Sequence, residues 1–162
     1  MNQVKLIADE LDACYSGSPW HGPSLKQNLA GVTARQAATR AGETHTIWEL
    51  VLHLAAWRGE ITRRLEGEQA GTPKEGDYPP APEGDDATQA AWHRALAWLE
   101  DEHTRLLAAV RGIRDDDLPV PVLDYRHGSS GEGATRAVTL HGLAQHDAYH
   151  SGQIGLLRKM LR

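Results

Sequence analysis

Apolar residues recur at every third or fourth position in four separate stretches of the chain. This spacing places them on one face of an α-helix and leaves the polar residues on the opposite face. The pattern predicts four long amphipathic helices, at residues 3–16, 46–67, 86–112 and 136–161, and two short helical turns at 24–30 and 33–40. Strands and helices do not alternate as they do in proteins with a parallel sheet. The pattern therefore predicts an all-α fold, specifically a four-helix bundle.

Local signals indicate where the two central helices begin and end. Thr46 precedes an apolar run and is followed three residues later by Glu49, which is the form of a capping box. Asp86 can cap the next helix in the same way with Gln89. Gly67 follows the last apolar residue of the first of these helices, where a glycine commonly ends a helix. These signals support two well-bounded central helices.

Two long irregular segments connect the predicted helices. Residues 68–86 are rich in proline, glycine and acidic residues and form a longer connection than compact domains usually contain. We interpret this segment as a crossover between helices that are not simple neighbours, or as a flap over a site. In the second segment, residues 120–125 could form a short extended piece and residues 127–133 a flexible turn. A two-stranded ribbon is one arrangement that would join them.

Composition narrows the class of protein. The 162 residues fit one domain, spanning 1–162, and the net charge of −5 comes without the basic cluster that nucleic-acid binding needs. No apolar run is long enough for a membrane helix, and the first residues do not resemble a signal peptide. The single cysteine, Cys14, cannot form an internal disulfide and fits a reducing compartment. We therefore expect a cytoplasmic protein that binds neither nucleic acid nor membrane.

A histidine pair in the last helix is the first candidate for chemistry. His146 and His150 are four residues apart, so both imidazoles lie on one helical face and can reach one metal ion. On a helical wheel both fall within a stripe of apolar residues, so we expect them to point into the protein, and Asp147 to point away from that face. The stripe consists of Leu143, Tyr149, Leu156, Leu157, Met160 and Leu161. Two hydrogen-bonded core histidines remain the alternative.

His53 is a candidate for the third ligand. It lies at the edge of the apolar stripe of the helix at 46–67, where a ligand to a half-buried ion would be expected. Its alternative role is that of an ordinary histidine between helices. Three imidazoles leave coordination positions open, which is typical of catalytic sites, because structural zinc sites fill all four. Nitrogen ligands suit Zn²⁺ or Ni²⁺ best, although Fe²⁺, Co²⁺ or Mn²⁺ would also bind.

Three segments together resemble the DinB/YfiT-like metalloenzyme family, a group that includes bacillithiol transferases. They are residues 20–24 (WHGPS), 47–57 (IWELVLHLAAW) and 146–154 (HDAYHSGQI), so the resemblance covers nearly the whole chain. The resemblance implies a bundle of up-down-down-up topology, in which residues 68–86 would be the crossover. It also implies a divalent metal held by His53, His146 and His150, and a homodimer.

The resemblance implies several activities. Relatives include metal-dependent S-transferases that use low-molecular-weight thiols, a thiol-dependent maleylpyruvate isomerase, and hydrolases. We therefore expect an S-transferase that joins such a thiol to a small electrophile, with a hydrolase or a non-enzymatic, stress-associated metal-binding protein as alternatives. Gln153 and His21 are the candidate catalytic residues. Their alternative roles are a helix-packing amide for Gln153 and a surface loop histidine for His21.

Overall fold

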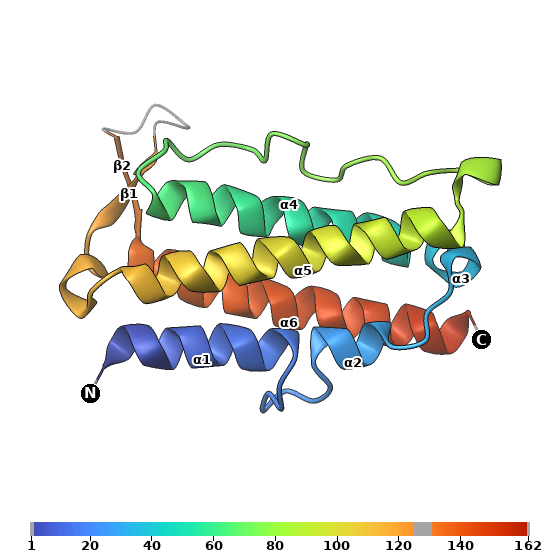
Figure 1. Ribbon diagram of the computed structural model, residues 1–162, viewed down its shortest axis with the longest axis horizontal. Coiled ribbons are helices and arrows are strands. Elements are labelled where there is room, and N and C mark those ends of the chain that lie inside the picture. The colour runs from blue at the N-terminus through green and yellow to red at the C-terminus, as the bar shows by residue number, and fades with distance from the viewer. Residues whose placement is uncertain (1, 125–130, 162) are drawn as a thin grey trace.

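Four long helices lie side by side in the computed structural model, which describes residues 2–124 and 131–161 (Figure 1). Two short helices follow the first long one, and a two-stranded sheet precedes the last. The helices are α1 (Gln3–Tyr15), α2 (Leu25–Leu29), α3 (Ala34–Ala38), α4 (Ile47–Leu65), α5 (Gln89–Gly112) and α6 (Arg136–Met160). The predicted all-α class is confirmed.

Helix α4 begins as its sequence predicts, whereas α5 begins later. Thr46 accepts a hydrogen bond from the Glu49 backbone, and the Glu49 side chain bonds back to Thr46, which completes the capping box. The cap of α5 is Thr88, whose side chain accepts from the Ala91 backbone N–H. Asp86, the predicted cap, instead lies in a 3₁₀ turn at Gly84–Asp86.

The long connection between α4 and α5 runs the length of the bundle (Figure 1). It starts where α4 ends and returns to the opposite end before α5 begins, so α4 and α5 run in the same direction. The packing between these two helices is the most extensive in the fold. This course carries residues 68–86 along the outer side of α4, where they can reach its side chains.

A short antiparallel ribbon precedes α6. Strand β1 (Pro121–Asp124) pairs with β2 (Gly131–Thr135), which is the ribbon that the sequence allowed for. The predicted flexible turn at 127–133 lies partly outside the described residues. Thr135 ends the ribbon and caps α6, because its side chain accepts from the Val138 backbone N–H.

A buried ion pair separates two apolar clusters of the core. The first cluster surrounds Trp48 and Trp92, and the second surrounds Leu106 and Leu140. Between them, Arg58 Nη2 donates to Asp147 Oδ2 at 2.8 Å, and both side chains are essentially fully buried. Burial raises the Asp147 pKa to about 6, although the nearby guanidinium opposes that shift. The pair ties α4 to α6 across the core.

The predicted core face of α6 is confirmed in part, since Leu143, His150 and Leu157 are buried as expected. The wheel placed the apolar stripe inside, but four large apolar side chains of α6 are 60–64% exposed: Val138, Tyr149, Leu156 and Met160. The buried face carries small or polar residues, among them Ala144, Asp147 and Ser151, together with Leu140, Leu143, Ile154 and Leu157. It overlaps the predicted stripe only at Leu143, His150 and Leu157, because α6 packs through a face that also includes small residues and the ion pair. Asp147, expected to point away, lies in the core.

None of the described helices combines the length and the apolar content that crossing a bilayer requires. Cys14 is buried and is a free thiol. Burial is the main reason that its pKa rises to about 11, so the thiol stays protonated at neutral pH and is unreactive.

Candidate metal centre

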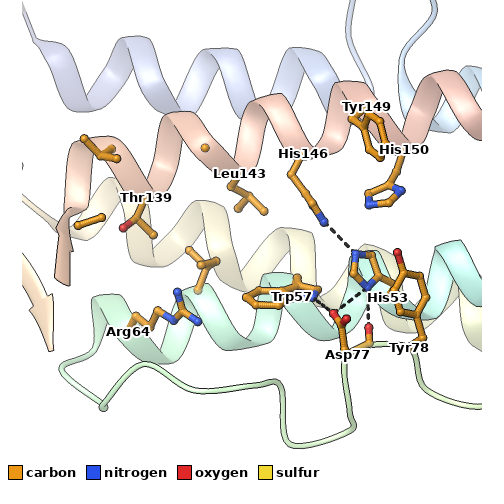
Figure 2. Close-up of a pocket in the computed structure, with 14 residues that line it drawn as sticks. His53, Trp57, Arg64, Asp77, Tyr78, Thr139, Leu143, His146, Tyr149 and His150 are labelled. Carbon is orange, nitrogen blue, oxygen red and sulfur yellow. Dashed lines mark hydrogen bonds and ion pairs between the residues drawn. The ribbon is translucent and has the colours of Figure 1, made fainter. Parts of the chain in front are cut away.

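Three histidines from two helices converge on one point (Figure 2). His53 comes from α4, and His146 and His150 come from successive turns of α6. Their candidate ligand atoms all lie within 4.8 Å of one another. An ion with Zn–N bonds of about 2.0–2.1 Å could therefore meet all three after small side-chain rotations. The structure thus brings together the three residues that the sequence singled out.

Hydrogen bonds on the outer nitrogens orient two of these rings. His53 Nδ1–H donates to the backbone carbonyl of Asp77, and His150 Nδ1–H donates to Gln153 Oε1 at 2.6 Å. Because both partners are acceptors, they assign the ring proton to Nδ1 and leave Nε2 as a free lone pair. Such outer partners are the usual way in which proteins fix a metal-binding histidine.

The inner nitrogens fit a cation. His53 Nε2 and His146 Nε2 are 2.9 Å apart, and Nδ1 of His146 is buried without a hydrogen-bond partner among the described residues. Without an ion this contact is a hydrogen bond in which His146 carries its proton on Nε2, and that tautomer leaves its buried Nδ1 as an acceptor without a donor in the described part of the chain. A divalent ion would instead accept the Nε2 lone pairs of both rings, so the donor set fits a metal.

The site favours neutral imidazoles. Burial is the largest cause that lowers the pKa of His53 and of His150. Burial and the two neighbouring histidines lower the His146 pKa to about 3. All three rings are therefore neutral at pH 7, which is the protonation state that binds a metal ion.

The crossover segment covers the His53 side of the site. Tyr78 stacks on His53 with 4.1 Å between ring centroids and on His45 with 3.8 Å on its other face. Asp77 Oδ1 accepts from Trp57 Nε1 at 2.7 Å, beside its backbone contact to His53. These loop residues were not predicted, because their place depends on the course of a segment without periodicity.

A pocket of about 550 Å³ adjoins the histidines between α4 and α6 (Figure 2). Trp57 and Ile61 form its wall on α4, and Leu143 lies on α6. The three histidines stand at one end and Arg64 at the other, as Figure 2 shows. A small molecule in this pocket would contact mostly apolar side chains and reach the open side of the ion.

The two predicted catalytic candidates have different surroundings. Gln153 contacts His150 directly and so belongs to the site as a positioning residue. His21 lies in the exposed turn between α1 and α2 and does not line the pocket. Gln153 also lines a second, smaller cavity beside Leu156 and Met160.

Comparison with known proteins identifies one family. A family model described as the DinB superfamily matches residues 23–154, which include all three histidines and most of the bundle. Searches of curated proteins and of solved structures found no match.

Proposed function

The chain belongs to the DinB superfamily, and we propose that it is a divalent-metal-dependent enzyme whose metal site lies in a helical bundle. His53, His146 and His150 hold the ion, with Zn²⁺ or Ni²⁺ as the preferred metals. The observation that carries this proposal is the convergence of three neutral imidazoles beside an apolar pocket. Three protein ligands leave room for a substrate atom, as in catalytic sites.

The reaction proposed forms a bond between the sulfur of a low-molecular-weight thiol and an electrophilic carbon of a small molecule, whose leaving group departs with the electron pair of the broken bond. When bound, the ion supplies a Lewis acid that favours the deprotonated form of a coordinated thiol at neutral pH. Sulfur then needs no general base from the protein. This route fits the described residues, because it assigns all three histidines to the ion and needs no further base. The apolar walls would hold the electrophile and exclude water.

A hydrolase is the second candidate, and one observation favours it. The Asp77 side chain is 55% exposed and lies 3.4 Å from His53 Nδ1, so a carboxylate stands at the edge of the site. In a hydrolase this carboxylate would accept the proton of an attacking water. Asp77→Asn would then abolish activity, whereas a thiol transferase would keep most of its activity.

Metal content tests the ligand set. Purified protein should contain about one divalent ion per chain by elemental analysis, and His150→Ala should lose most of it, because two imidazoles bind far more weakly than three. His141→Ala is the matched control, since this exposed histidine lies on the same helix and pairs with Glu10. Equal metal content in wild type and His150→Ala would contradict the site.

Thiol binding separates the candidate reactions. We expect the visible spectrum of Co²⁺-substituted protein to change on addition of at least one biological thiol, because sulfur in the open position alters the ligand field. A spectrum that no thiol changes would rule out the transferase and leave the hydrolase. Non-enzymatic metal storage would give bound metal but no turnover with any electrophile or ester.

A further inference from the structure

Arg64 closes the end of the pocket that is remote from the histidines. It lies eleven residues after His53 on α4, and eleven residues make about three helical turns, so both side chains lie on one face of the helix. Trp57 stands between them, and Thr139 of α6 lies opposite Arg64 (Figure 2). The pocket therefore has two polar ends and an apolar middle.

The Arg64 guanidinium is held by two hydrogen bonds and still has N–H donors that could bind a ligand. Its Nε donates to Glu60 at 2.9 Å and its Nη2 to the Gly71 carbonyl at 2.8 Å. Its carbon lies 5.5 Å from the centroid of the Trp57 ring, so the planar group rests against that aromatic face. A guanidinium has five N–H donors, and among the described residues Nη1 has no partner. A fixed guanidinium with free donors is suited to a carboxylate.

The charges around Arg64 leave an excess of positive charge. Glu60 is shared, since it accepts from both Arg63 and Arg64. Glu68 faces Arg63 at 3.9 Å and Lys74 at 3.7 Å. Three cations thus stand against two carboxylates, and one positive charge is uncompensated within this cluster. An anionic ligand group beside Arg64 would compensate this remaining positive charge.

The distance between the ends limits the ligand. The Trp57 ring centroid lies 5.5 Å from the Arg64 guanidinium carbon and 6.3 Å from the centroids of the His53 and His146 rings. A ligand lying along the Trp57 ring would span both of these distances over an apolar surface. A single small anion would not reach both ends.

We propose that Arg64 binds the carboxylate of an elongated small molecule whose reactive atom lies at the three histidines and whose middle is apolar. The placement of the reactive atom rests on the proposed function, but carboxylate binding by Arg64 does not. The carboxylate belongs either to the thiol or to its reaction partner, and both supply the same chemistry. Thr139 can add a hydroxyl donor from the opposite wall.

Matched ligands test this site on the Co²⁺-loaded full chain. Mercaptooctanoate and mercaptooctanol carry the same thiol and differ only in the terminal carboxylate, and octanoate and octanol form the same pair without a thiol. By calorimetry, the acid of at least one pair should bind about tenfold or more tightly than its alcohol, because charge-assisted hydrogen bonds are strong. A preference in the thiol pair alone assigns the carboxylate to the thiol. Equal affinities within both pairs would overturn the proposal.

Two arginine variants test whether Arg64 is the cause of the preference for the acid. Arg64→Met should abolish the preference for the acid, whereas Arg63→Met should retain it, because Arg63 pairs with the same Glu60 but does not line the pocket. A preference that survives Arg64→Met, or that both variants lose equally, would contradict direct binding. If Arg64→Met does not fold, Arg64→Gln replaces it. Glutamine keeps a polar side chain without the positive charge, so an unchanged preference would again contradict the proposal.

The Co²⁺ spectrum distinguishes a failure of the proposed thiol reaction from a failure of carboxylate binding by Arg64. A thiol that changes the Co²⁺ spectrum in both wild type and Arg64→Met, with equal affinity for acid and alcohol, supports the metal site and refutes the Arg64 site. A spectrum that no thiol changes refutes the thiol reaction. In that case the octanoate and octanol affinities still decide whether Arg64 binds a carboxylate.

Discussion

The bond from His150 to Gln153 is the clearest case in which one side chain prepares another for metal binding. Gln153 Oε1 accepts the Nδ1 proton of His150 and thereby directs its Nε2 toward the other two histidines. The partners are three residues apart on α6, so their contact follows from helix geometry alone. An ion at the three histidines would therefore be affected by the amide through the ring that the amide orients.

We expect Gln153→Met to weaken metal binding by about tenfold to a hundredfold, because outer partners of metal ligands contribute effects of this size. Methionine keeps the length of the side chain and removes the acceptor. Competition with a chromophoric chelator would measure the dissociation constant. Gln145→Met, at an exposed position on the same helix, is the control and should leave it unchanged. Equal constants in all three proteins would show that the amide has no such role.

At the scale of single residues, sequence spacing located the three histidines but not their partners. The four-residue interval between His146 and His150 fixes their relation on any helix. Asp77 and Tyr78 reach His53 only because the crossover passes over α4, and no local pattern encodes that course. Arg64 could have been found, because it shares a helical face with His53 and Trp57 at intervals of four and seven residues.

Helices α4 and α6 are joined at mid-length by Arg58 and Asp147. Both side chains are buried, and Nε of Arg58 and Oδ1 of Asp147 have no hydrogen-bond partner among the described residues. Such a pair contributes little net free energy, because desolvation offsets the attraction, yet losing one member leaves a charge buried alone. The pair also sets the rotation of α6, since it draws Asp147 inward beside His146.

Arg58→Met should lower the free energy of unfolding by about 3–5 kcal/mol, measured by urea denaturation at pH 7.5. The double variant Arg58→Met with Asp147→Leu should recover most of that loss, because two apolar side chains leave no unpaired charge. A double variant as unstable as the single one would mean that packing around the guanidinium, including its contact with Tyr15, matters more than the charges.

At the scale of helices, the sequence located the helices but could not orient every one. Thr46 and Glu49 mark the start of α4 through local hydrogen bonds, and the helix begins where they predict. The face of α6 was misplaced in part because apolar periodicity ranks Tyr149 and Leu156 above Ala144 and Ser151, whereas close helix packing favours small residues. Which residues become core depends on the partner helix, and one helix alone does not contain that information.

On the whole molecule, the exposed apolar side chains of α6 form the surface most suited to a second copy of the chain. Tyr149, Leu156 and Met160 are 60–64% exposed and follow one another at intervals of seven and four residues. Such a stripe matches the seam along which helices pair. The homodimer that the resemblance implies stays a prediction, and this stripe is its candidate interface.

Light scattering after gel filtration should give the mass of two chains for the wild type and of one chain for Leu156→Glu, because a buried carboxylate opposes association. Leu6→Glu is the control, since Leu6 is 52% exposed on α1 and lies outside the stripe. A monomeric wild type would contradict the dimer. A dimer that survives Leu156→Glu would place the interface elsewhere.

The histidine triad also has a consequence for the folding equilibrium. His53 and His146 are 93 residues apart in the chain, so an ion between them would act as a reversible cross-link that closes most of the protein into one loop. Disulfides that close long loops stabilise proteins by restricting the unfolded chain. An ion that binds only the folded chain adds about 2.7 kcal/mol when its free concentration is a hundred times its dissociation constant. Metal supply would thus set how much of this chain survives unfolding and proteolysis, whatever its substrate.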